Sequence, residues 1–294
     1  MAARHTRESA YELVNSMSLP KRRKWLVREQ RYPRLLFKFF PILQQQAETK
    51  SRFEQILIDS KLWMSAVSDF NDPFDARLAV SAGGTLADQK RHFLAMHKAM
   101  PTPPGEIRLT DVDIEAVVEK SFAAGTLSKA AQRGYDNAMA RFGICCFASD
   151  PRSILMWSHY ASSHRGICAV FRPDIGPEPL IEALPVKYGR EYPRFDKILD
   201  DPMQVARRGL FRKFKRWQYE GERRIVRMDT ARSHISFAAD ALYAIVLGCG
   251  ASEATRTLLE ELLAERARKK LPSVALLQAT RHPEKYEISI RSAN

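Results

Sequence analysis

Apolar residues occur along this chain in short runs separated by amphipathic segments. Five runs are short and rich in β-branched or aromatic residues, at 35–40, 62–64, 142–147, 166–171 and 242–247. Runs of this length and composition predict buried strands. Further short strands are predicted at 186–188, 274–279 and 286–290, the last from its alternating apolar residues.

Apolar residues three or four positions apart predict helices between these strands. The predicted helices cover 51–62, 86–100, 111–124, 154–161 and 253–270. Short strands with interleaved helices are typical of an α+β protein, here with one mixed or antiparallel sheet and flanking helices.

The chain divides into two parts by charge and pattern. Residues 1–34 are basic and predict a helical N-terminal extension, in which Lys21–Lys24 stand beside Trp25. Residues 35–294 predict a single α+β domain. The helices of its middle third indicate a helical insertion at about 82–141.

The segment Phe70–Asp75 combines an amide, two carboxylates and a proline. Asp72 precedes Pro73, and proline is favoured at the first position of a helix. A helix start is therefore predicted, with Asp72 as its N-cap and Asp75 in the first turn. Asn71 could present its amide to a ligand from the same turn.

The feature of the composition that bears most on function is the net charge. The 294 residues are 45% hydrophobic and 28% charged, which is ordinary for a folded protein, but the net charge is +13. Such a balance favours a polyanionic partner such as nucleic acid, a phosphorylated ligand or an anionic membrane surface. No apolar run approaches the length of a membrane span, and no signal-peptide pattern follows the first residues. Four cysteines without C-x-x-C spacing predict no metal site and a reducing, cytoplasmic location.

The densest basic run, Lys213–Arg227, contains two carboxylates. Glu220 and Glu222 are two residues apart and precede the strand-like Ile225 and Val226. On a strand they would face one site, where two adjacent carboxylates suit acid–base chemistry or stabilisation of a developing cation. A plainer interpretation is a half-exposed strand whose glutamates neutralise neighbouring basic residues. The residues of this run expected to contact nucleic acid are Lys213, Lys215, Arg216 and Trp217.

Polar aromatic residues gather in the predicted helix 154–161. His159 and His164 are five residues apart, so they form no His-x-x-x-His metal pair. Tyr160 and His164 are four apart and can meet, and a buried, hydrogen-bonded pair is the plain interpretation. The chain has neither a G-x-S-x-G elbow nor a phosphate-binding loop, so hydrolase and ATPase activities are not indicated.

Three motifs resemble those of a bacterial family called domain of unknown function 2971. They are Phe70–Asp75 (FNDPFD), Met156–Ala161 (MWSHYA) and Trp217–Arg223 (WQYEGER), in the family's order. The resemblance covers roughly residues 35–290 and implies no particular reaction.

A more distant resemblance is to ADP-ribosyltransferases of the His-Tyr-Glu type. The order of predicted strands and helices is similar, and Glu222 stands where that family's catalytic glutamate opens a late strand. Two departures are the absence of a histidine on the first strand and Cys146-Phe147 in place of the expected tyrosine. The resemblance implies NAD as substrate, no metal, and an ADP-ribosyltransferase-like fold.

With that resemblance, the expected site has two sets of residues. The catalytic candidates are Glu222, Glu220, Tyr160 and His159, and the NAD-binding candidates are Lys38, Asn71, Phe147, Ser149 and Trp157. Glu222 would stabilise the oxocarbenium-like ribose. We expect Asn71, His159, Tyr160 and Glu222 to converge on one cleft, because polar residues in apolar elements require partners.

The leading hypothesis is therefore ADP-ribosyl transfer from NAD or NAD cleavage, acting on nucleic acid, in bacterial or phage defence or as a toxin. One alternative is a non-catalytic nucleic-acid-binding module with a defence or regulatory role, using Lys21–Lys24 and Lys213–Arg216. Another is a metal-dependent nuclease that uses Asp72, Asp75, Glu220 and Glu222.

Overall fold

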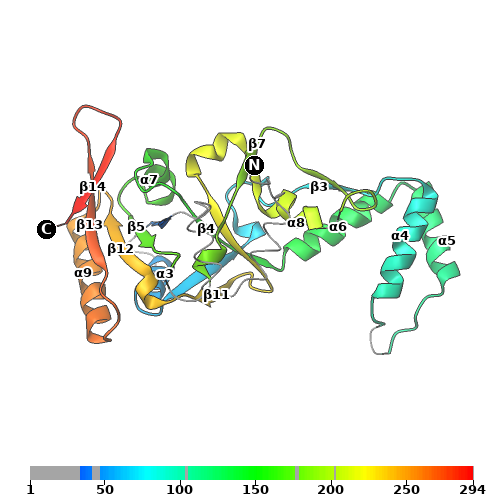
Figure 1. The fold of residues 1–294 in the computed structure, drawn as a ribbon, viewed down its shortest axis with the longest axis horizontal. Coiled ribbons are helices and arrows are strands. Elements are labelled where there is room, and N and C mark those ends of the chain that lie inside the picture. Colours follow the sequence, from blue (N-terminus) through cyan, green and yellow to red (C-terminus); the bar gives the residue numbers. More distant parts are fainter. Residues whose placement is uncertain (1–33, 42–46, 103–104, 176–178, 202, 294) are drawn as a thin grey trace, which may run out of the picture.

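The computed structural model describes residues 34–41, 47–102, 105–175, 179–201 and 203–293. The predicted N-terminal extension at 1–34, including Lys21–Lys24, lies outside these residues except for Arg34. The described part is an α+β arrangement of mostly antiparallel sheets and helices, elongated in one direction (Figure 1). Its α-helices are α3 (Ala47–Leu57), α4 (Leu86–Ala99), α5 (Asp111–Ala123), α6 (Leu127–Met139), α7 (Ile154–Tyr160), α8 (Met203–Leu210) and α9 (Glu253–Arg268).

The first sheet has five strands in the order β1-β5-β12-β13-β14. They are β1 (Leu36–Phe40), β5 (Ile167–Phe171), β12 (Leu242–Leu247), β13 (Ala275–Arg281) and β14 (Ile288–Ser292). All neighbours are antiparallel except β12 and β13. Parallel neighbours need a long crossover, which α9 provides between them.

The second sheet also has five strands, in the order β11-β2-β4-β10-β6, and is antiparallel throughout. They are β2 (Lys61–Ala66), β4 (Phe142–Phe147), β6 (Leu184–Pro185), β10 (Arg223–Met228) and β11 (Ser233–Ser236). The expectation of one sheet is thus wrong. An isolated bridge connects the two sheets, where Phe37 N donates to Ala148 O at 3.1 Å and Ala148 N donates to Phe37 O at 2.6 Å.

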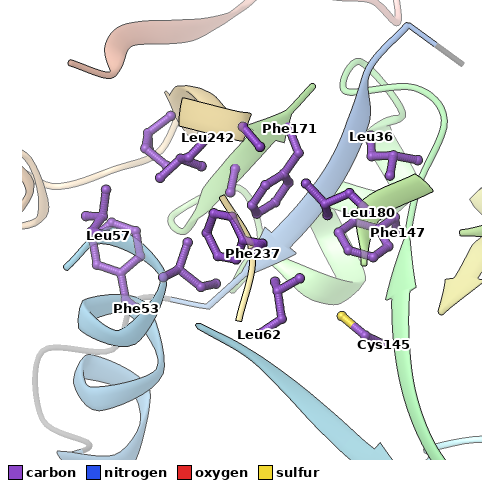
Figure 2. Packing of buried hydrophobic residues seen from close by; sticks show 14 of the residues in the cluster. Leu36, Phe53, Leu57, Leu62, Cys145, Phe147, Phe171, Leu180, Phe237 and Leu242 are labelled. Carbon is purple, nitrogen blue, oxygen red and sulfur yellow. The ribbon is translucent and has the colours of Figure 1, made fainter. Parts of the chain in front are cut away.

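The main apolar core receives side chains from both sheets, which explains why two sheets form. Leu36 and Phe171 come from the first sheet and Leu62 and Cys145 from the second, and all are buried (Figure 2). Helix α3 adds Phe53, and α9 packs against the same core. A single sheet would leave one side of these residues in water, at a cost of roughly 1.5–3 kcal/mol for each large side chain.

Helix α7 covers the opposite face of the first sheet. Trp157 is fully buried there and its ring meets Phe39 edge-on, with centroids 5.1 Å apart. Its indole N–H donates to Pro151 O at 2.7 Å, which satisfies the polar atom of this buried ring. These contacts fix the position of His159 and Tyr160 at the end of the helix.

The helical middle third lies at one end of the molecule, where α4 and α5 project as an antiparallel pair (Figure 1). Capping boxes start both helices, with Thr85 and Asp88 in α4 and Thr110 and Asp113 in α5. Helix α6 returns toward the second sheet, where its Tyr135 packs in one cluster with residues of β4.

Two short parallel pairs complete the described sheets. Strand β3 (Ala79–Ser81) pairs with β8 (Arg194–Asp196), and β7 (Lys187–Gly189) pairs with β9 (Arg212–Phe214). Short 3₁₀ helices are η1 (Val67–Asp69), η2 (Leu180–Glu182), η3 (Lys215–Glu220) and η4 (Ala239–Ala241). None of the helices in the described part of the chain is both long and apolar enough to cross a bilayer.

The predicted helix start at Asp72 is wrong, because this segment forms a turn. Asp72 Oδ1 accepts a hydrogen bond from Phe74 N at 2.9 Å, and Asp75 N donates to Asp72 O at 3.1 Å. Ala76 then adopts a positive φ of 54°, which ends any helical continuation. Aspartate before proline suits such a turn as well as a helix N-cap.

Candidate functional site

A cavity of about 420 Å³ lies where α7, β1, the end of β4 and the turn after η1 meet. We call it the first cavity. Asn71, His159, Tyr160 and Glu222 all line it, so these four residues converge as expected from the sequence. Their chemical roles stay predictions.

Five charged side chains form the floor of the first cavity and its surroundings, and we call them the buried ionic cluster. They are Asp75, Lys213, Glu220, Glu222 and Arg224, each less than a tenth exposed. Charges at this depth require both ionic partners and hydrogen bonds.

Arg224 is the centre of this cluster and is completely buried on β10. Its Nε and Nη2 donate to the two oxygens of Glu222 at 2.7 and 2.9 Å, and Nη2 also contacts both oxygens of Asp75 at 2.7 Å. Nη1 donates to Leu210 O at 2.8 Å. The planar guanidinium therefore orients two carboxylates at once.

Lys213 joins the three carboxylates at one point. Its ammonium lies 2.6 Å from Glu220 Oε2, 3.1 Å from Asp75 Oδ2 and 3.3 Å from Glu222 Oε2. Burial lowers the pKa of Lys213, but the three carboxylates outweigh it and hold this pKa well above its usual value. Lys213 is thus a permanent cation of the cluster.

Glu220 and Glu222 reach the cavity by a route that strand alternation does not describe. Glu220 is the last residue of η3, and Glu222 comes just before β10. Gly221 between them adopts the left-handed conformation, with φ of 50°, and a Cβ there would come within 2.1 Å of Ser149 Oγ. The turn at Gly221, rather than a strand, directs both carboxylates to one site.

The pKa values of these two carboxyl groups are shifted in opposite directions. Burial raises the pKa of Glu220, and Lys213 only partly opposes this. Burial also raises the pKa of Glu222, but the charge and hydrogen bonds of Arg224 outweigh it and lower this pKa to about 2. Glu222 is therefore a fixed anion, while Glu220 is the carboxyl suited to exchange a proton.

Tyr160 connects Glu220 to the interior of the cavity. Its hydroxyl donates to Glu220 Oε1 at 2.6 Å, and Asn71 lies against the same hydroxyl. Burial and the neighbouring Glu220 raise the pKa of Tyr160, so the phenol stays protonated and acts as a donor. His159 is exposed nearby, with Nδ1 2.9 Å from the hydroxyl of Tyr219.

The residues expected to hold NAD are placed unevenly. Lys38 and Phe147 line the first cavity with Asn71, and the Lys38 ammonium donates to Cys146 O at 3.0 Å. Ser149 is exposed beside Gly221, and the buried Trp157 anchors α7. Neither of these two is among the residues that line the first cavity.

The residues expected to contact nucleic acid also separate. Lys215 and Arg216 are exposed and Trp217 is half-buried, but Lys213 is buried among carboxylates. Contact of Lys213 with a phosphate backbone, expected from its place in a basic run, is therefore revised, because its charge is already neutralised inside the protein. Its ammonium also lies 4.8 Å from the centre of the Trp217 ring.

Sequence reasoning missed Lys213 as an ionic partner of the glutamates and the burial of the whole cluster. Asp75 was expected in a helix start or in the metal site of a nuclease, and Arg224 was expected to be neutralised by the glutamates only on a half-exposed strand. Tyr188 was also missed, whose hydroxyl accepts from Glu222 N at 2.8 Å. One signal was available, since Glu222 and Arg224 are two residues apart at the start of a strand and so share a face.

The cluster does not resemble a metal centre. Within the described ranges, no group of three or more histidine, cysteine, aspartate or glutamate side chains is arranged to hold a metal ion. The carboxylates of Asp75, Glu220 and Glu222 converge instead on the Lys213 ammonium. This cation stands where the nuclease hypothesis would place a metal.

Comparison with known proteins gives no relative for this chain. No protein-family model matches it, and neither a curated protein nor a solved structure matches it. The two family resemblances stay predictions.

Proposed function

We propose that the side chains of the first cavity catalyse cleavage of the bond between nicotinamide and ribose in NAD. The ADP-ribosyl group is transferred to water or to nucleic acid. The observation that carries this proposal is the pair of oppositely tuned carboxyls, Glu220 and Glu222, beside the Tyr160 hydroxyl. The proposal includes an ADP-ribosyltransferase-like fold and the motif resemblance to the family of unknown function.

The charge of the buried ionic cluster suits this reaction. Three carboxylates face two cations, which leaves one negative charge in excess when all five are ionised. As the ribose C1′–N bond breaks, its electron pair leaves with nicotinamide and positive charge develops on the ribose. A fixed anion in a site shielded from water stabilises such a charge strongly.

Glu220 is the better candidate for the acid–base step, which changes the expectation that Glu222 is the main catalytic residue. Its raised pKa brings it closer to neutral pH, where a general base is most effective. In the proposed reaction, Glu220 accepts the proton of the acceptor hydroxyl as the new C1′–O bond forms. Glu222, held by Arg224 through two hydrogen bonds, contributes negative charge and positions the cluster.

The remaining lining residues support binding of a dinucleotide. The ammonium of Lys38 makes no ion pair with any residue that the structure describes, and it can neutralise a pyrophosphate. The ring of the half-buried Tyr160 offers a face for nicotinamide, whereas Phe147 is 2% exposed and its ring belongs to the main apolar core. A volume of about 420 Å³ falls within the usual range of ligand cavities.

The test is release of nicotinamide from NAD, with and without RNA or DNA as acceptor. Glu220→Gln keeps the shape and an acceptor for Tyr160, and we expect it to lower kcat about a hundredfold. Lys38→Ala should raise KM. Glu260→Gln, on the exposed side of α9, is the matched control and should leave both constants unchanged. The proposal fails if the wild-type chain releases no nicotinamide under any of these conditions.

A second candidate is nucleic-acid binding without catalysis, for which Lys215 and Arg216 provide the specific observation. Both are exposed on η3 and directly precede Trp217 in the sequence. A binding module has no need of the paired carboxyls, so nucleic-acid affinity that survives Glu220→Gln together with absent NAD cleavage would favour it. Either function would suit a defence or toxin-like role in a bacterium.

A further inference from the structure

A second cavity, of about 430 Å³, adjoins the first. It lies between the turn that contains Asp72 and the ends of the parallel strands β7 and β9. Asn71 and Lys213 line both cavities, so the two hollows share a wall. Nothing in the proposed cleavage chemistry requires this second space.

Aromatic side chains from separate segments gather around the second cavity. Phe74, Tyr192 and Phe214 are 66%, 45% and 46% exposed, and the half-buried Trp217 joins them. The rings of Phe74 and Tyr192 meet edge-on, with centroids 6.1 Å apart. Large aromatic groups held at a concave surface are typical of sites that stack a planar ligand.

Two arginines line the same cavity. Arg190 is exposed and Arg212 is half-buried, and neither makes a salt bridge with a residue in the described ranges. The guanidinium of Arg212 lies against Gly189, where a Cβ would come within 2.8 Å of Nη2. Glycine at this position leaves room for the guanidinium beside the cavity.

The carboxylates of the lining do not cancel these charges directly. Asp72 is buried and its Oδ1 already accepts from Phe74 N, at 2.9 Å. Glu191 is exposed and forms no salt bridge with either arginine. The cavity thus combines stacking surfaces with two arginines available for an anion.

We infer that the second cavity binds one nucleotide, with its base against the aromatic rings and its phosphate on Arg190 and Arg212. Aromatic rings stack any base, and guanidinium groups match phosphate oxygens in pairs. The nucleotide has two sources, the adenylate half of a dinucleotide or one unit of a single-stranded nucleic acid. The inference goes beyond NAD cleavage, since binding is measured without turnover.

Binding of AMP, measured by calorimetry with the full chain, is the main test. We expect AMP to bind more tightly than adenosine or inorganic phosphate, because each of these meets only half of the site. Tyr192→Ala and Arg212→Gln should each weaken AMP binding about fivefold or more. Phe74→Ala is a second aromatic variant, on a side chain too exposed to support the fold.

Matched controls lie elsewhere on the surface. Tyr243→Ala removes a tyrosine of similar exposure (49%) from β12, and Arg133→Gln removes an exposed arginine from α6. Both should leave the affinity for AMP unchanged. Loss of affinity confined to the cavity variants supports the inference.

Competition identifies the source of the nucleotide. Displacement of AMP by NAD but not by a short oligothymidylate assigns the site to the dinucleotide, and the reverse assigns it to nucleic acid. The inference is overturned if neither AMP nor the oligonucleotide binds, or if Tyr192→Ala and Arg212→Gln both bind AMP as the wild type does. These results are independent of NAD cleavage, so each proposal can fail alone.

Discussion

The two cavities are nearly equal in volume and share a wall, yet their charges are organised in opposite ways. In the first, Glu220 and Glu222 are buried and held by cations. In the second, Arg190 and Arg212 have no ionic partner among the described residues and stand beside exposed aromatic rings. One arrangement holds charges in fixed positions, and the other leaves them available.

This difference indicates different tasks. Burying five charges costs free energy that an apolar core of the same volume would not, so a buried ionic cluster is poor evidence of stabilisation. Its fixed geometry is what chemistry on a substrate requires. Exposed arginines and aromatic rings cost little to maintain and suit reversible binding. Changing each type of charge in turn tests whether the two cavities have different tasks.

The largest effect is expected from Arg224→Met. This change leaves the buried carboxylates of Asp75 and Glu222 without their main partner, so we expect the free energy of unfolding to fall by about 3–5 kcal/mol. Urea denaturation measures it. Arg227→Met on the same strand is the control, because Arg227 pairs with Glu182 at a partly exposed position and should cost about 1 kcal/mol or less. Equal losses for the two variants would contradict a special role for the buried cluster.

A smaller effect is expected in the pH dependence of stability. The pKa of Glu222 is lowered from 4.5 to about 2, so its contribution is present above pH 4.5 and is lost as pH falls toward 2. Glu222→Gln should therefore remove about 1–3 kcal/mol of pH-dependent stability in that window. Glu220 acts with the opposite sign, because its raised pKa makes the folded state less stable as pH rises above 4.5.

Unfolding free energies measured across this pH range separate the two cavities. For Arg190→Gln in the second cavity, the free energy of unfolding should depend on pH in the same way as that of the wild type. An unchanged slope in Glu222→Gln would show that Arg224 does not hold this carboxyl as the contacts indicate.

The smallest effect on stability is expected from the double change Lys215→Gln and Arg216→Gln. Both side chains are exposed, so the free energy of unfolding should change by less than about 0.5 kcal/mol. If they contact a phosphate backbone, the slope of log affinity against log salt should become shallower by about 2. Filter binding at several salt concentrations measures this slope. Polynucleotide binding with an unchanged slope would place the contacts elsewhere.

Strands and helices with regular patterns were predictable from the sequence. The six apolar residues of β12 and the Ser252 cap of α9 are examples, because burial and capping act locally. Helix α6 was predicted only as part of the helical insertion at about 82–141 and not as a separate element, although four of its residues at spacing four, Leu127, Ala131, Tyr135 and Met139, are buried. The division into two sheets was also missed, since the sequence of a strand does not specify which other strand it pairs with.

The candidate site was predictable only where its residues are close in sequence. The pairing of Glu220 with Glu222 followed from their spacing, although a turn at Gly221 produces it. Asp75 lies 149 residues before Arg224 in the chain, and no local sequence pattern connects the two. Lys213 was expected on the surface because a run of basic residues usually faces solvent, and its burial depends on carboxylates from a distant turn.

The distance in sequence between Asp75 and Arg224 also bears on how the chain folds. Each charge of the cluster loses water when it is buried and regains that energy only when its partners arrive. The apolar core can form from many contacts in any order, but the cluster is complete only when Asp75 reaches Arg224 and Lys213. Closing so long a stretch of chain is slow, so the cluster is expected to form after the strands around it. A chain in which folding stopped one step early would have its sheets and helices but no working site.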